Sequence, residues 1–116
     1  MDISELQAKV IQFRDERDWA QYHNPKDLAI SLSLEAAELL EIFQWKGSEE
    51  VEGLKSDSQV QQKVREELGD IFIYALTLAH EFGFEPAEVV LDKLRVNERR
   101  YPKEKVRGKA DKYNAY

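Results

Sequence analysis

Two acidic residues that fall beside the apolar stripe of a helix constrain this chain more than any other feature. At about 100° per residue, the apolar side chains of residues 28–43 cluster within roughly 80° of a helix surface. This stripe comprises Leu28, Leu32, Ala36, Leu39 and Phe43. Glu35 lies at its edge and Ile42 neighbours Glu38, so both carboxylates point toward the interior, whereas Glu41 turns away. The helix therefore needs a partner for its buried acids.

The segment 65–74 repeats the pattern. Glu67 falls among its apolar positions, and Asp70 lies about 60° to one side. An unpaired buried carboxylate costs several kcal/mol, so it must be protonated, paired with a cation or bound to a metal. Arg65 lies about 160° away around the same helix, and residues 27–45 contain no basic residue. The sequence offers no cation for these acids.

Two acid pairs at i, i+3 spacing on antiparallel helices would converge into a four-carboxylate cluster. Oxygen ligands favour Mg²⁺, with Mn²⁺ also possible. The alternative is that these acids lie at the rim of a bundle and reach solvent. A di-iron centre requires Glu-x-x-His on two helices, but only His23 and His80 are present and Thr77 precedes His80 by three residues. Phosphate-loop, dinucleotide and zincin motifs are absent, which leaves Mg²⁺-assisted chemistry on phosphate esters or anhydrides.

The periodicity predicts an all-α fold, since no stretch alternates polar and apolar residues as a strand would. Four helices with short connections suggest a four-helix bundle. The first expected helix spans about 2–19 and the second spans 25 to about 45, followed by a loop at 46–56. The third is expected to begin at a cap formed by Ser56, Asp57 or Ser58 and to end at about 82, and the fourth to run from 86 toward the basic segment 99–102. Asn24-Pro25 and Glu85-Pro86 predict helix starts, and Gly83 predicts a stop.

The length of 116 residues predicts one domain, which we divide into a catalytic part, 1–100, and a basic tail, 101–116. The absence of cysteine and of any apolar run of about 20 residues predicts a soluble cytoplasmic protein without a membrane partner. Residues 1–92 carry 8 basic and 20 acidic residues, against 9 and 3 in 93–116. The acidic body argues against nucleic-acid binding, whereas the tail could bind nucleic acid, ligand phosphates or the body, or remain solvated.

Five segments in order resemble one known family. They are FRDERDW (13–19), HNPKDLA (23–29), LEAAELLEIFQW (34–45), EELGDIFIY (66–74) and KLRVNERRYP (93–102). Together they are similar to the MazG-like nucleotide pyrophosphohydrolases, dCTP pyrophosphatase branch. The resemblance implies a MazG-like bundle that cleaves a nucleoside triphosphate between its α and β phosphates, with dCTP or a related pyrimidine dNTP preferred, in nucleotide-pool house-cleaning.

The resemblance also implies roles for individual residues. The expected metal ligands are Glu35, Glu38, Glu67 and Asp70, and the general base would be one of these carboxylates or Glu41. The expected substrate contacts are Trp19 and Trp45 around a nucleobase, His23 at the base or sugar, and Tyr74 and Asn97 at the sugar or phosphates. By their charge alone, Lys93, Arg95 and Arg100 are candidates to bind phosphates. His23 could instead serve only the helix cap or loop, and both tryptophans could be core or interface residues. Arg95 departs from the acid or small polar residue expected of close relatives, and the tail with Lys109, Lys112 and Tyr113 resembles one that closes over the site.

A single bundle with a long apolar helix cannot cover its own surface, which predicts a homo-oligomer. The resemblance favours a tetramer built as a dimer of dimers, or a dimer, with sites near subunit interfaces. Two other functions remain open from the residues. One is a nucleotide sensor that retains the pocket without efficient catalysis, and the other is a helical oligomerisation or regulatory module whose acids are structural.

Overall fold

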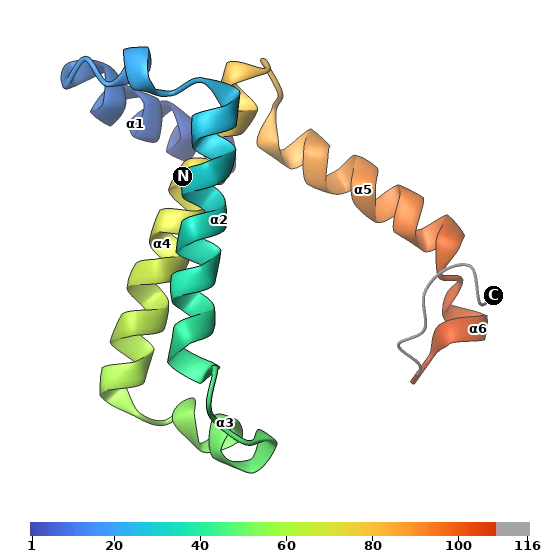
Figure 1. Ribbon diagram of the computed structural model, residues 1–116. Helices are drawn as coiled ribbons and strands as arrows, with labels where there is room; N and C mark the ends of the chain where they lie inside the picture. Colours follow the sequence, from blue (N-terminus) through green and yellow to red (C-terminus); the bar gives the residue numbers. More distant parts are fainter. Residues whose placement is uncertain (109–116) are drawn as a thin grey trace.

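Two long antiparallel helices, α2 (Pro25–Phe43) and α4 (Ser58–Glu81), form the body of the molecule in the computed structural model, which describes residues 1–108 (Figure 1). Helix α1 (Ile3–Glu16) packs against one end of this pair, and a short 3₁₀ helix, η1 (Ala20–Tyr22), leads into α2. Helix α3 (Ser48–Leu54) connects α2 to α4 at the other end. Helices α5 (Pro86–Arg100) and α6 (Lys103–Val106) follow. Residues 1–108 contain no strand, so the all-α prediction is confirmed.

The helix starts and the glycine stop lie where the sequence predicts them. The Asn24 side chain accepts a hydrogen bond of 2.9 Å from the backbone N–H of Asp27, and Pro25 occupies the first turn of α2. At the start of α4, Asp57 Oδ1 accepts hydrogen bonds from the backbone N–H groups of Gln59 and Val60 at 2.9 and 3.2 Å. Gly83 follows α4 with a φ of +70°, a left-handed conformation that glycine adopts without strain.

Two boundaries differ from the prediction. Helix α1 ends at Glu16 rather than continuing to Trp19, because Asp18 adopts a positive φ of 54° and breaks the helical path. The predicted loop 46–56 contains α3. Its first turn carries Glu49 and Glu50, whose charges favour a helix N-terminus and outweigh the helix-breaking glycine within it.

The apolar core lies where α1 crosses the helix pair. Its buried apolar side chains within residues 1–108 include Ile11, Leu28 and Leu76. Arg14 is also buried, and its guanidinium binds Glu81 at 2.5 Å and Asp15 at 3.0 Å. This ion pair ties the end of α1 to the end of α4.

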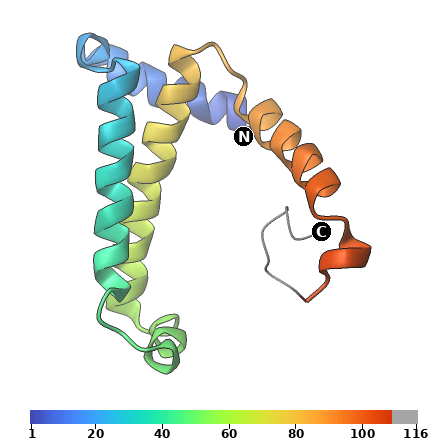
Figure 2. The same ribbon diagram turned by 45° about the vertical axis from the view of Figure 1, so that its right-hand side comes forward.

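Helix α5 points away from the other long helices, as both views show (Figures 1 and 2). Pro86 at its start is buried, and Ser4 Oγ donates to Glu85 Oε1 at 3.1 Å, but Val89, Val90 and Leu94 beyond it are about half exposed. The radius of gyration is 17.5 Å, against about 13 Å for a compact domain of this length. The four long helices of the predicted bundle are present, and α5 contacts α1 near its start but diverges from α2 and α4 along its length.

No helix among the described residues is suited to cross a lipid bilayer. Within residues 1–108, none combines the length and the apolar character that such a crossing needs.

Candidate functional site

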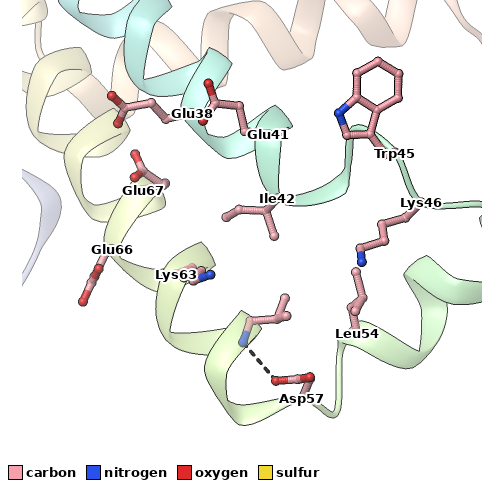
Figure 3. A pocket seen from close by; sticks show the side chains of 11 residues that line it. Glu38, Glu41, Ile42, Trp45, Lys46, Leu54, Asp57, Lys63, Glu66 and Glu67 are labelled. Atoms are coloured by element: carbon pink, nitrogen blue, oxygen red, sulfur yellow. Dashed lines mark hydrogen bonds between the residues drawn. The ribbon is translucent and has the colours of Figure 1, made fainter.

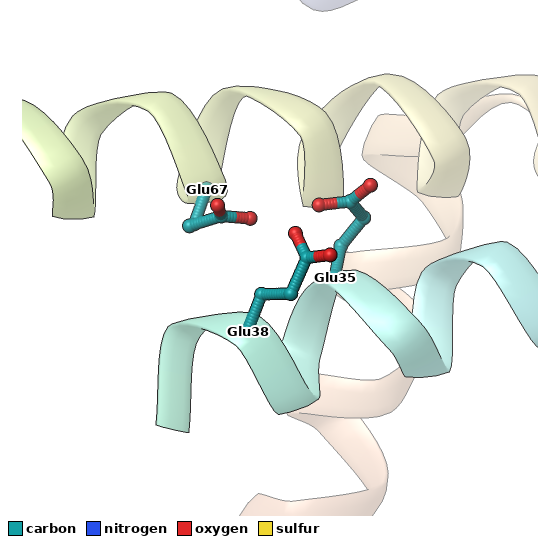
Figure 4. A group of neighbouring side chains, drawn as sticks. All are labelled: Glu35, Glu38 and Glu67. Atoms are coloured by element: carbon teal, nitrogen blue, oxygen red, sulfur yellow. The ribbon is translucent and has the colours of Figure 1, made fainter. Parts of the chain in front are cut away.

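Three carboxylates meet between the two long helices. Glu35 and Glu38, three residues apart on α2, face Glu67 on α4, and one oxygen of each lies within 4.8 Å of the others (Figure 4). Glu35 and Glu67 are half-buried, whereas Glu38 is exposed. The cluster forms because an i, i+3 pair shares one helix face and α4 presents Glu67 toward that face.

Two oxygen atoms of this cluster lack the partners that buried polar atoms require. Glu35 Oε2 and Glu67 Oε2 are inaccessible to solvent and have no hydrogen-bond partner among the described residues. Leaving such atoms unpaired costs on the order of 1–3 kcal/mol each. A divalent cation would satisfy both atoms and offset the charge, so the residues present fit a hard metal ion with oxygen ligands.

The pKa of Glu35 shows how closely these acids approach one another. Hydrogen bonding with Glu67 is the largest cause that raises this pKa, from 4.5 to about 7, followed by desolvation and then by Glu38 and Asp70. Each cause favours the protonated carboxyl, which donates to a neighbouring carboxylate and removes one negative charge. In the absence of a metal ion, Glu35 therefore takes up a proton as the pH falls through about 7.

A cavity of about 750 Å³ opens beside the cluster, between the end of α2, α3 and the start of α4 (Figure 3). Its volume lies within the range of small-molecule sites, roughly 300–1,000 Å³. Its lining combines acids, two lysines and apolar side chains: Glu38, Glu41, Ile42, Trp45, Lys46, Leu54, Asp57, Val60, Lys63, Glu66 and Glu67. The cavity therefore joins a candidate metal centre to a space large enough for a nucleotide.

Asp70 and Glu41, the other acids predicted from the sequence, both lie near the cluster without belonging to the group of three. Asp70 is exposed, and its charge contributes to the raised pKa of Glu35. Glu41 lines the cavity one turn beyond Glu38. Both carboxylates can take part in chemistry at the cluster.

The two tryptophans predicted to flank a nucleobase lie at opposite ends of α2. This helix of 19 residues is about 28 Å long. Trp45 lines the cavity and is 86% exposed, whereas Trp19 precedes η1 and packs edge-on against Phe13 with ring centroids 5.8 Å apart. One chain therefore does not bring both indoles to the same pocket.

His23 also lies at the far end of α2 from the cavity. Pro25, two residues later, is about 15 Å along the helix from Glu35. Burial lowers the pKa of His23, and the charge of Arg14 lowers it further, while Glu81 opposes both effects. Its Nδ1 atom is buried and has no hydrogen-bond partner within residues 1–108. Burial and the charge of Arg14 therefore both favour the uncharged imidazole.

The remaining predicted contacts lie outside the cavity. Tyr74 is half-buried on α4, about 10 Å along the helix from Glu67. Lys93, Asn97 and Arg100 belong to α5, which diverges from α2 and α4 (Figure 2), and none of the three lines the cavity. The predicted tail contacts, Lys109, Lys112 and Tyr113, lie outside the described residues.

The sequence analysis missed two basic residues that line the cavity, Lys46 and Lys63. A signal for Lys63 was present, because it precedes Glu67 by four residues and therefore shares its helix face. Lys46 lies just beyond the end of α2, where helical periodicity gives no direction for its side chain.

Fold and site together define an all-α protein with a candidate divalent-metal centre between two antiparallel helices. A model of the MazG-like family matches residues 30–115, and the chain belongs to this family. It is 41% identical over 112 residues to dCTP pyrophosphatase 1 of Bos taurus and 38% identical to that of Homo sapiens. Each alignment covers 97% of this chain but 64% of the relative, so the chain spans less than two thirds of these proteins.

A solved structure supports the same assignment. The crystal structure of a pyrophosphatase from Archaeoglobus fulgidus superposes with a TM-score of 0.77 at 47% identity. The alignment covers 87% of this chain and 93% of that one. The predicted resemblance to the MazG-like family is therefore confirmed.

Proposed function

We propose that this chain is a metal-dependent nucleoside triphosphate pyrophosphohydrolase. It would cleave a (d)NTP between the α and β phosphates to a monophosphate and pyrophosphate, with dCTP or a related pyrimidine dNTP preferred. The observation that carries this proposal is the group of three carboxylates, two with orphaned buried oxygens, at the edge of a 750 Å³ cavity. Similarity to two mammalian dCTP pyrophosphatases supports the substrate class.

The carboxylates would bind the ion that the reaction needs. Glu35, Glu38 and Glu67 would hold Mg²⁺, or Mn²⁺ in its place, with Asp70 beside them. The bound ion would offset the charge of the phosphates. The carboxylates that bind the metal would remain ionised, and one acid of the chain would accept the proton of the attacking water.

Hydrolysis adds one water across the α–β anhydride. The water oxygen bonds to one phosphorus atom, the bridging oxygen leaves with the other phosphate, and one of Glu35, Glu38 or Glu41 accepts the water proton. Glu38 and Glu41 both line the cavity, one turn apart on α2. These positions support a base on α2 that faces the substrate.

A second copy of the chain would complete the substrate pocket. Trp45 is in place to stack on a base at the cavity, but five of the other predicted contacts lie elsewhere in the chain: Trp19, His23, Lys93, Asn97 and Arg100. Apolar residues on the outer faces of α2 and α4 are exposed, including Leu34, Leu40 and Phe72, each by about 60%. We therefore propose a homo-oligomer, a dimer or a tetramer built from two dimers, with 1–100 as the catalytic domain and 101–116 as a basic tail.

The proposed homo-oligomer would have a mass in solution that is a multiple of the chain mass of 13.6 kDa. Light scattering coupled to size exclusion should give twice or four times that value, because exposed apolar patches of this extent favour association. A charge on this surface, such as Leu40→Asp, should shift the mass toward one chain. Recovery of the wild-type protein as a monodisperse single chain would contradict the proposal.

The proposed activity is tested by incubating the protein with each common dNTP and NTP in the presence of Mg²⁺. Monophosphate and pyrophosphate in equal amounts are expected, with dCTP turned over fastest and with no product after addition of EDTA. Diphosphate with orthophosphate would mean that another bond is cut. Nucleotide-dependent stabilisation without product would favour a sensor, and neither effect would favour a structural module. The activity would serve nucleotide-pool house-cleaning in the cytoplasm.

A further inference from the structure

A second cavity, lined mostly by apolar side chains, lies at the α3 end of the helix pair. Its volume is about 510 Å³, and we call it the apolar groove. Its apolar lining comprises Phe43, Val51, Leu54, Val60, Val64 and Leu68. On α4, Val64 and Leu68 each follow a residue of the first cavity, Lys63 and Glu67, so the groove uses a helix face about 100° away. The apolar groove is therefore distinct from the candidate nucleotide site.

The charges at the apolar groove restrict what can occupy it. Its only charged lining residues are Lys55 and Arg65, and no acid lines it. The second half of α5, residues 93–100, carries four basic residues and one acid, so these like charges disfavour its docking there. An aromatic ring suits both the apolar lining and a cation at the edge. The same chain already stacks the Arg17 guanidinium over the Phe13 ring, 3.7 Å from its centroid.

The chain exposes such a ring one helical turn beyond the groove. Phe72 on α4 is 62% exposed. Val64, Leu68 and Phe72 follow one another at intervals of four residues, so they share a helix face and lie about 6 Å apart along the axis. Leu68 is therefore midway between the groove at Val64 and the exposed ring. A two-fold axis at Leu68 would place the ring of each copy in the groove of the other, the self-complementarity that a symmetric dimer requires.

Helix α2 extends the same apolar face. Phe43 lines the groove, and Leu40, three residues earlier on α2, is 60% exposed. The uncovered apolar surface thus spans both long helices. Two copies joined across it would form a bundle of four long helices, two from each chain, and this arrangement buries apolar faces that one chain leaves in water.

We propose that a second copy of this chain docks on this face, with its α4 antiparallel to the first and its Phe72 in the apolar groove. The inference rests on the homo-oligomer of the proposed function and names its contact. Leu54 and Val60 line both the groove and the candidate nucleotide cavity. The partner's ring would pack behind these two side chains and stabilise a wall of the nucleotide cavity.

The first experiment uses disulfide formation, because the chain contains no cysteine of its own. In Leu68→Cys the two thiols would face each other at the two-fold axis, so mild oxidation should convert most of the intact protein into a disulfide-linked pair of chains. Gln62→Cys is the matched control. Gln62 is exposed on the same helix, about 120° around from Leu68, and does not line the groove. It should remain a single chain under the same oxidation.

The second experiment exchanges the ring and the hollow. Phe72→Val should raise the dissociation constant of the oligomer at least about tenfold, because each pair of chains loses two aromatic anchors. Adding Val64→Phe returns a ring to the contact from the opposite side and should restore most of the association. Light scattering over a range of protein concentrations measures both variants. Far-ultraviolet circular dichroism checks that they are folded, which the exposure of Phe72 favours.

Three outcomes would overturn the inference: a wild-type protein that is a single chain, equal cross-linking of the two cysteine variants, or unchanged association in folded Phe72→Val. An oligomer that shows neither the Leu68 cross-link nor the Phe72 dependence would keep the oligomer and reject this contact. The product assay on wild type separates the contact from the catalytic proposal. The expected cross-link and exchange results in a protein without turnover would support the contact and reject the enzyme.

Discussion

The Glu67→Gln variant is expected to lose at least about 100-fold in turnover with dCTP while it retains its helical content. Glutamine keeps the shape of the side chain but provides a neutral ligand in place of a charged one. Glu67 is the member of the cluster that α4 contributes, so its neutralisation removes the only contribution of this helix to the group of three carboxylates found in residues 1–108. Steady-state kinetics over a range of Mg²⁺ concentrations measures the effect.

Glu50→Gln is the matched control for this experiment. Glu50 lies exposed in the first turn of α3, at the same end of the molecule, and does not line the cavity. It should keep wild-type turnover and the wild-type response to Mg²⁺. Full activity in Glu67→Gln, at any Mg²⁺ concentration that saturates wild type, would reject the metal centre proposed between α2 and α4.

Without a metal ion, the stability of the folded protein is expected to depend on pH. The pKa of Glu35 is raised from 4.5 to about 7, chiefly because its protonated carboxyl can donate a hydrogen bond to Glu67, which the ionised form cannot do. The folded state therefore binds this proton more tightly than the unfolded state does. The resulting stabilisation is fully present below about pH 4.5 and is lost as pH rises through about 7. In EDTA, the melting temperature should fall by a few °C between pH 5.5 and 8.

Mg²⁺ should offset the loss of stability at high pH, since the metal and the proton compete for the same carboxylate. At pH 8 the ion should raise the melting temperature, whereas at pH 5.5 it should have little effect. Differential scanning calorimetry with and without Mg²⁺ measures both. In Glu35→Gln the contribution of this carboxyl to the pH slope should vanish and the Mg²⁺ effect should shrink. An unchanged slope in that variant would show that other groups cause the pH dependence.

Helical periodicity was enough to bring together three of the four carboxylates predicted to cluster, but it did not predict the whole cavity. The angles of Glu35, Glu38 and Glu67 around their helices follow from 100° per residue, and α2 and α4 have to be adjacent because their apolar stripes face each other. The lining contributed by α3 could not be predicted, since this seven-residue helix lies in a polar segment with two glycines. Short helices carry too few turns for a periodic pattern to stand out.

The positions of the predicted substrate contacts could not be predicted from the sequence for a different reason. The sequence places Trp19 before α2 and Trp45 after it, so the length of this helix already separates them within one chain. Similarity to a family points to residues that act together, but it does not say whether one chain supplies them all. The direction of α5 was also beyond prediction, because the chain turns at Gly83 with a positive φ between α4 and α5 and helical periodicity does not fix the angle of such a turn.

In the proposed oligomer, the small core described above would couple the folding of this chain to its concentration. Ile11, Leu28 and Leu76 cluster at one end of the helix pair, and much of the remaining apolar surface faces outward. A chain on its own gains little from burial, so contacts with further copies would supply much of the stability of the folded state. The melting temperature should then rise with protein concentration. The amount of this protein in a cell would set what fraction of it is folded.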